Sequence, residues 1–376
     1  FIDCMKLDGT RLWRIDLGRN IRAGAHYTQF MVYDLDGDGC AEMVAKTSDG
    51  TVDGTGKVIG DPNADYRVHE GNTGHIMSGN EYLTVFNGRT GAAMQTVEYV
   101  PGRGEPGIWG DNNANRSERY LATIAYLDGE HPSVVMCRGY YTRATLAAWD
   151  WNGKELKLRW LFDSHSDPSL KAYEGQGNHN LRAADVDGDG CDEIIYGSCC
   201  IDNDGTGLYS NGFGHGDSMH LGAMIPGSDE LQVWIGHEQR GVGSTLTDAA
   251  TGKLYWRIPS NTDVGRSMAA DVDPTNPGWE MWSSASRSMR DFRGDSIAVK
   301  PASQNFAVWW DGDLSRELLD GNHIDKFNPE TRLVENLVTF EGATSNNGSK
   351  SNPAISGDLL GDWREEVLLR AEDNSE

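Results

Sequence analysis

Residues 33–42 read YDLDGDGCAE, and residues 184–193 read ADVDGDGCDE, an almost unchanged copy. Degenerate echoes follow at residues 270–280 and 357–366. Each acidic segment leads into a short apolar stretch, such as residues 43–45 or 194–196. The chain thus repeats the order turn, then strand, which is the pattern of a fold built from many similar β units.

A second repeat is a hairpin, present at residues 83–91 and again at residues 243–256. We expect two-residue turns there, because Asn and Gly tolerate positive φ. Glycine is abundant, at 46 of 376 residues, and we find no amphipathic helix of three turns or more. These features predict an all-β fold, a β-propeller of four-stranded blades forming one domain over residues 1–376. Residues 49–80 and 101–118 are predicted to be inserted surface loops, and both chain ends look cut.

The two perfect acidic repeats are predicted to bind Ca²⁺. Alternating carboxylates on a sharp turn can point at one hard cation. A glutamate at the ninth position, counted from the first aspartate of the loop, can complete the coordination shell. An EF-hand needs its glutamate at position 12 and flanking helices, so these are loops of another kind. A solvated acidic turn without metal is the alternative. The expected ligands are Asp34, Asp36, Asp38, Glu42, Asp185, Asp187, Asp189 and Glu193.

Three histidine-bearing segments are rich in glycine, which lets the backbone approach a ligand closely. They read GQGNHN at 175–180, GHGDSMH at 214–220 and GHE at 236–238. In a propeller these segments meet near the central axis, so His179, His215, Asp217 and Glu238 could converge on one cation or substrate. Because histidine is a poor Ca²⁺ ligand, Asp217 and Glu238 would hold such an ion. Each histidine could instead be an ordinary hydrogen-bonded residue.

Two cationic residues, Arg266 and Lys350, stand in polar loops of an otherwise acidic chain. We interpret them as contacts to an anion, with a carboxylate partner on the surface as the alternative. The chain has 33 Lys and Arg against 57 Asp and Glu, a net charge of −24, which argues against nucleic-acid binding. No apolar run approaches the ~20 residues of a membrane helix. The six cysteines are expected to be buried or free thiols.

Six runs of sequence stand out, at residues 20–27, 46–51, 175–180, 214–217, 309–313 and 360–366. They resemble the corresponding runs of the bacterial rhamnogalacturonan lyases of polysaccharide lyase family eleven. The resemblance implies an eight-bladed propeller with several bound Ca²⁺ ions and β-elimination at galacturonate in the rhamnogalacturonan backbone of pectin. Family members have further chain at both ends. Departures are mild: Ser349 where threonine is usual, and Cys40 and Cys191 where lysine is common.

A uronate lyase removes a proton next to a carboxylate, which requires that the carboxylate first be neutralised by cations. The hypothesis is that Arg266 and a Ca²⁺ ion at His179, His215, Asp217 and Glu238 neutralise it. Lys350 is the base or a second neutraliser, and His179 is the alternative base. Asn347, Gly348 and Ser349 would position sugar hydroxyls.

Two other functions compete with this interpretation. A noncatalytic Ca²⁺-loaded propeller for adhesion or carbohydrate binding shares the acidic loops but gives no reason for Arg266 and Lys350. A quinone-dependent dehydrogenase would repeat the hairpin of residues 248–256 in nearly every blade, and the sequence shows one clean copy. We expect a secreted, periplasmic or cell-surface monomer that acts on pectin.

Overall fold

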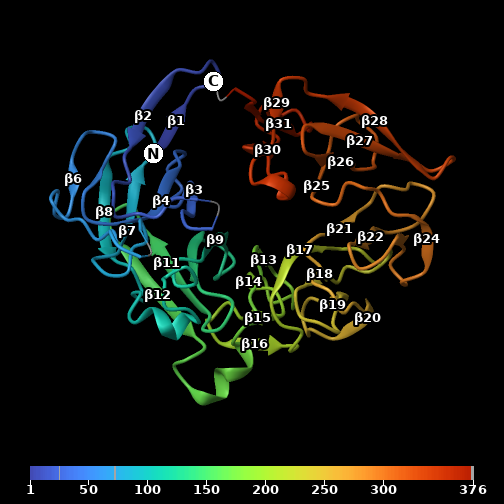
Figure 1. Ribbon diagram of the computed structural model, residues 1–376, viewed down its shortest axis with the longest axis horizontal. Coiled ribbons are helices and arrows are strands. Elements are labelled where there is room, and N and C mark those ends of the chain that lie inside the picture. The colour runs from blue at the N-terminus through green and yellow to red at the C-terminus, as the bar shows by residue number, and fades with distance from the viewer. Residues whose placement is uncertain (25, 72, 374–376) are drawn as a thin grey trace. The chain divides into compact units, whose positions relative to one another are not determined.

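The computed structural model describes residues 1–24, 26–71 and 73–373, and over them the all-β prediction is confirmed (Figure 1). Contacts divide the chain into two compact units, Phe1–His215 and Gly216–Glu376. The helical segments in the described part are short 3₁₀ turns: η1 (Pro106–Trp109), η2 (Pro168–Tyr173) and η3 (Gly348–Lys350). None of the described helices is long and apolar enough to cross a membrane.

The described part of the first unit holds three four-stranded antiparallel sheets, ordered β3-β4-β7-β8, β9 to β12 and β13 to β16, besides the pairs β1-β2 and β5-β6. The strands are β1 (Ile2–Met5), β2 (Arg11–Ile15), β3 (Phe30–Tyr33), β4 (Glu42–Thr47), β5 (Thr51–Val52), β6 (Val58–Ile59), β7 (Tyr82–Asn87), β8 (Ala93–Glu98), β9 (Tyr120–Ala125), β10 (Ser133–Arg138), β11 (Thr145–Trp151), β12 (Leu156–Asp163), β13 (Arg182–Ala184), β14 (Glu193–Ile195), β15 (Cys199–Ile201) and β16 (Gly207–Ser210).

The described part of the second unit holds three more such sheets, β17 to β20, β21 to β24 and β25 to β28, with the pairs β30-β31 and β29-β32. The strands are β17 (Gly216–Gly222), β18 (Gln232–His237), β19 (Ser244–Asp248), β20 (Leu254–Ile258), β21 (Ser267–Ala270), β22 (Glu280–Ser283), β23 (Ser288–Arg290), β24 (Ser296–Val299), β25 (Phe306–Val308), β26 (Glu317–Asp320), β27 (His323–Asn328), β28 (Leu333–Thr339), β29 (Ala343–Thr344), β30 (Ile355–Gly357), β31 (Glu366–Leu368) and β32 (Arg370–Ala371).

One hydrogen bond recurs at the entrance to these sheets, and we call it the loop latch. The side chain that begins the second strand accepts a hydrogen bond from the backbone N–H seven residues earlier, at 2.8–3.1 Å. The latch closes the loop between the first two strands onto the sheet. Its acceptors in the described residues are Glu42, Glu193, Gln232, Glu280, Glu317 and Glu366.

A tryptophan on the last strand of three of these sheets, β2, β12 and β20, binds a turn of another sheet within the same unit. The indole N–H of Trp13 donates to the Gly88 carbonyl at 2.8 Å, and that of Trp256 donates to Phe292 at 2.7 Å. Trp160 makes the same bond to Asn203 at 2.8 Å. Tryptophan docking therefore recurs where the sequence showed one clean copy, because the turns that receive it differ in sequence.

The hairpin turns are longer than predicted. Asn87 and Asp248 each donate a backbone hydrogen bond to the residue five positions on, so residues 88–91 and 249–252 form the loops. Positive φ falls on Gly91 and Gly252, both at +67°, and not on the Asn-Gly pair at 87–88. The Asn87 and Asp248 side chains instead accept hydrogen bonds from the turn backbone, which stabilises the longer loop.

The inserted segments are not confined to the surface. Residues 49–80 separate β4 from β7, yet Asp49 and Asp53 are 2% and 3% exposed. Residues 101–118 separate β8 from β9 and bury Trp109 and Glu118. Charged groups of this second insertion enter the core because oppositely charged groups meet them there. The cysteines are free thiols, as expected, and Cys137, Cys199 and Cys200 are buried.

A buried ion network joins the second insertion to the sheets. Glu81 contacts Arg138 at 2.6 Å, Arg103 at 2.9 Å and Lys46 at 3.0 Å. Glu118 contacts Arg103 at 2.9 Å. Burial works against ionisation of Glu81, but Arg138 and Lys46 hold its pKa well below the usual range. Glu81 therefore stays ionised although it is buried in the first unit.

We expect Arg138→Met to destabilise the protein by about 3–5 kcal/mol, because it breaks a buried ion pair and leaves Glu81 and the Ser117 and Pro101 carbonyls without the hydrogen bonds that Arg138 donates. The free energy of unfolding in urea measures the effect. Arg14→Met, which breaks an exposed ion pair with Asp3, is the matched control and should change little. Equal losses in the two variants would contradict the prediction.

Candidate active site

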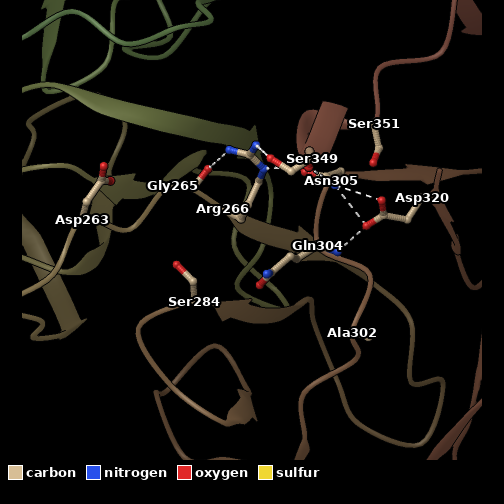
Figure 2. A pocket seen from close by; sticks show the side chains of 10 residues that line it. All are labelled: Asp263, Gly265, Arg266, Ser284, Ala302, Gln304, Asn305, Asp320, Ser349 and Ser351. Atoms are coloured by element: carbon tan, nitrogen blue, oxygen red, sulfur yellow. Dashed lines mark hydrogen bonds between the residues drawn. The ribbon is translucent and has the colours of Figure 1, made fainter. Parts of the chain in front are cut away.

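A pocket of about 630 Å³ lies in the second unit (Figure 2). Its wall comes from the segment before β21, the residue after β22, the loop before β25, strand β26, and η3 with the residue that follows it. Its lining is polar and carries charges of both signs. The lining residues are Asp263, Gly265, Arg266, Ser284, Ala302, Gln304, Asn305, Asp320, Ser349 and Ser351.

Arg266 precedes β21 directly, and hydrogen bonds hold its guanidinium in the pocket. Its Nη1 donates to the Gly265 carbonyl, while Nη2 and Nε donate to the hydroxyl and carbonyl oxygens of Ser349 at 3.2 and 3.4 Å (Figure 2). Asn305 Nδ2 donates to the same Ser349 carbonyl at 3.3 Å. The loop that carries Lys350 is thus bound to the strand that positions Arg266.

Arg266 and Lys350 face one carboxylate. Asp217, on β17, has one oxygen 3.8 Å from Arg266 Nη1 and the other 3.8 Å from Lys350 Nζ. Oxygens of Asp217 and Glu238 also lie within 4.8 Å of each other. The two predicted cations therefore do have a carboxylate neighbour, but they share it. Two adjacent carboxylates next to two cations form a candidate anion and metal site.

The three positions predicted to bind sugar hydroxyls form a tight turn. Asn347 and Gly348 have φ of +61° and +54°, and Ser351 has +50°. This left-handed backbone is strained for Asn347 and Ser351. Among the three, Ser349 lines the pocket, whereas Asn347 Nδ2 donates to Asn352 at 3.2 Å.

The histidine pair belongs to the first unit. The rings of His179 and His215 have centroids 4.9 Å apart. His215 Nδ1 donates to the Gly177 carbonyl at 2.5 Å, which leaves Nε2 as the basic nitrogen of the neutral ring. His179 is held by the hydroxyls of Tyr140 and Tyr141 at 3.0 and 3.3 Å. Burial raises the pKa of Tyr140, so its hydroxyl stays protonated. In the chain, Asp217 follows His215 by two residues.

The two perfect acidic repeats bring together most of their predicted ligands. Asp34, Asp36 and Glu42 form one group of converging oxygens, and Asp185, Asp187 and Glu193 form the other. The structure leaves Asp38 and Asp189 out of these groups. Their side chains accept hydrogen bonds at 2.8 Å from the backbone of Cys40 and Cys191, which stabilises the turn instead.

The repeat at residues 185–193 fits a divalent cation. Glu193 is fully buried, its Oε2 serves as a latch acceptor, and its Oε1 has no hydrogen-bond partner among the described residues. Burial, with nearby Asp187 and Asp189, raises the pKa of Glu193 to about 7. A buried carboxylate oxygen without a donor is costly, and a hard cation would satisfy it. The pKa of Glu42 is also raised, by burial and by the neighbouring carboxylates of its own loop.

A third acidic loop, at residues 311–317, was missed as a ligand group. Asp311, Asp313 and Glu317 converge in the same way. Here the ammonium of Lys326, from β27, contacts all three carboxylates, with 2.6 Å to Asp313 and 3.0 Å to Glu317. In this loop a lysine side chain of the protein itself takes the position that a metal ion could take among the three carboxylates. The signal was the run Asp311-Gly312-Asp313 followed by a latch glutamate, but no local pattern predicts Lys326.

Comparisons with known proteins agree over the whole chain. A model of the family described as "Rhamnogalacturonan lyase family 11, C-terminal domain" matches residues 1–376. The rhamnogalacturonan endolyase YesW of Bacillus subtilis (strain 168) is 54% identical over 377 residues, covering 100% of this chain and 60% of that protein. The exolyase YesX of the same organism is 54% identical over 392 residues, covering 100% and 63%.

A solved structure gives the same result. The Bacillus licheniformis rhamnogalacturonan lyase PL11 is 55% identical and superposes with a TM-score of 0.95 over 99% of this chain and 63% of that one. The chain thus spans about 60% of the length of the curated relatives it matches.

We predict that Ca²⁺ binding at residues 185–193 weakens as pH falls below about 7. Glu193 takes up a proton there in the ion-free protein, and the ion must displace it, so affinity should drop about tenfold per pH unit. Calorimetric titration of chelator-treated protein at several pH values measures this. Glu193→Gln should lose one bound ion, and Glu130→Gln, in an exposed turn, should lose none. A pH-independent affinity would contradict the prediction.

Proposed function

We propose that this chain, which belongs to rhamnogalacturonan lyase family 11 as its C-terminal domain, cleaves the rhamnogalacturonan backbone of pectin by β-elimination at galacturonate. The family resemblance seen in the sequence is confirmed by the comparisons. Relatives that match the full chain at 54% identity are an endolyase and an exolyase. A catalytic function is therefore favoured over an adhesive or merely carbohydrate-binding propeller. The proposal concerns the protein of which this chain is a part.

The shared position of Arg266 and Lys350 carries the proposal. The proton next to a carboxylate becomes acidic only when positive groups neutralise that carboxylate. Arg266 has a fork of donors suited to a carboxylate, and Ser349 holds that fork in place. Lys350 lies on the other side of Asp217 and adds a second positive group.

We propose Asp217 and Glu238 as the carboxylate ligands of a Ca²⁺ ion, with the His179 and His215 pair as its further candidates. Two carboxylates within 4.8 Å repel each other unless a cation lies between them. When bound, Ca²⁺ would supply charge neutralisation beside the reacting carboxylate. With Asp217 engaged in this way, Arg266 and Lys350 are available to a substrate anion.

We propose that Ca²⁺ also binds at residues 34–42 and 185–193, where it would stabilise the loops. The loop at residues 311–317 needs none, because Lys326 already contacts its carboxylates. For the finer architecture we propose the eight-bladed propeller implied by the family. Repeated four-stranded sheets and the recurring loop latch support it. A polymeric plant substrate suits a secreted, periplasmic or cell-surface enzyme, and we propose that it acts as a monomer.

Arg266→Met is expected to lower kcat/KM on rhamnogalacturonan by about a hundredfold or more, since it removes the fork that binds the carboxylate. Ultraviolet absorbance of the unsaturated product measures the rate. Arg293→Met, an exposed arginine paired with Asp291, is the matched control and should keep wild-type activity. A wild-type rate for Arg266→Met would rule out its proposed role.

Lys350→Arg separates the two roles considered for Lys350. Arginine keeps the positive charge but does not give up its proton at neutral pH. As a second neutraliser, Lys350 should tolerate arginine with a loss of about tenfold or less, whereas Lys350→Met should lose about a hundredfold. If both variants are equally inactive, Lys350 is the base. If both are fully active, it has neither role.

A further inference from the structure

Three arginines of the first unit surround two tyrosines, and we call this group the arginine–tyrosine cluster: Arg22, Arg116, Arg119, Tyr27 and Tyr141. The guanidinium carbons of Arg22 and Arg119 lie 3.9 and 5.4 Å from the centre of the Tyr27 ring. Those of Arg116 and Arg119 lie 4.8 and 5.9 Å from the centre of the Tyr141 ring. Arg119 contacts both rings and so links the cluster.

The guanidinium groups of the cluster form no ion pair with a carboxylate of the described residues, and the one acidic contact is made by the Arg116 backbone N–H, which donates to Asp111 at 2.7 Å. Arg116 donates to the Gly110 carbonyl at 3.2 Å, and Arg119 to the Asn115 amide oxygen at 3.3 Å, both neutral acceptors. Nη1 of Arg22 and Nε of Arg119 are buried and have no hydrogen-bond partner among the residues that the structure describes. On a chain of net charge −24, three adjacent arginines whose guanidinium groups form no ion pair within the described part of the chain are unexpected.

Backbone hydrogen bonds hold the cluster in place. The Tyr120 N–H donates to the His26 carbonyl at 3.0 Å, which joins the residue before Tyr27 to the segment that carries Arg119. The Gly139 N–H donates to the Arg119 carbonyl at 2.8 Å, which joins that segment to the turn before Tyr141. Asn115 Oδ1 accepts from the Tyr27 hydroxyl at 2.8 Å. The positive charges are therefore arranged before any anion binds, which lowers the cost of binding one.

The cluster adjoins the histidine pair, because the Tyr141 hydroxyl lies 3.3 Å from His179 Nε2 and the rings of Tyr141 and His215 have centroids 4.4 Å apart. Guanidinium forks bind carboxylates with paired hydrogen bonds, and the Tyr27 and Tyr141 rings hold these forks in position by cation–π contact. An anionic sugar presents such a carboxylate.

We propose that the arginine–tyrosine cluster binds the carboxylate of a galacturonate residue other than the one that is cleaved. The inference rests on the proposed function for the identity of the polymer. Galacturonate recurs along a rhamnogalacturonan backbone, so one bound chain presents several carboxylates. The cluster then sets affinity for long substrates and takes no part in the elimination.

The test compares Arg22→Gln, Arg116→Gln and Arg119→Gln with Arg67→Gln, a control that breaks an exposed pair with Asp65 in the same unit. Calorimetry measures binding of rhamnogalacturonan and of the same polymer with its carboxylates reduced to alcohols. Each cluster variant should bind the native polymer about tenfold more weakly, and KM should rise while kcat stays within about twofold. The reduced polymer should bind wild type and variants equally.

Wild-type affinity and KM in all three variants would overturn the inference and leave the lyase proposal standing. The converse failure is also distinct: weaker binding in the variants, with no unsaturated product from the wild-type protein, supports the cluster and contradicts the lyase proposal. If Arg119→Gln does not fold, Arg116→Gln decides, because in the described part of the chain the Arg116 guanidinium hydrogen bonds only to the Gly110 main chain. An equal loss for native and reduced polymer would show a structural role and overturn the inference.

Discussion

The loop latch is the interaction on which the rest of the structure depends. A carboxylate or carboxamide at the start of a second strand accepts the backbone N–H seven residues earlier, and so returns an acidic loop to its own sheet. The same side chain leaves its second oxygen at the centre of the loop, as Glu193 shows. One residue therefore both closes the turn and offers a ligand. This arrangement concentrates negative charge at the loop ends of the sheets.

The protein balances that charge in different ways at different loops. Lys326 contacts the carboxylates at residues 311–317, and Arg332 contacts Asp273 at 2.6 Å in another latched loop. At residues 185–193 no such cation is present among the described residues, and burial raises the pKa of Glu193 to about 7. Where the chain lacks its own cation, a hard metal ion is the physical alternative. Among the residues described, the guanidinium groups of Arg22, Arg116 and Arg119 form no ion pair, either with these acidic loops or with another carboxylate.

Much of the fold could be predicted because its signals are local. The spacing of Asp36, Glu42 and their copies sets turn, strand and latch within ten residues, and a local signal survives in sequence. Gln232 escaped notice because an amide accepts the latch hydrogen bond as well as a carboxylate does. The expected two-residue hairpins failed because Asn87 and Asp248 stabilise a longer loop. For the candidate site, residue type and glycine context singled out Arg266 and Lys350.

By itself, then, the sequence determined the all-β class, the acidic loops, the family and the residues of the candidate site, since all of these depend on short-range patterns or on long matched runs. Only the tertiary structure decided which charges meet. It placed Arg266 and Lys350 on either side of Asp217, Lys326 inside an acidic loop, and Arg22, Arg116 and Arg119 around two tyrosines. The physical reason is that electrostatic partners are chosen by distance in space, and packing of strands far apart in the chain sets that distance.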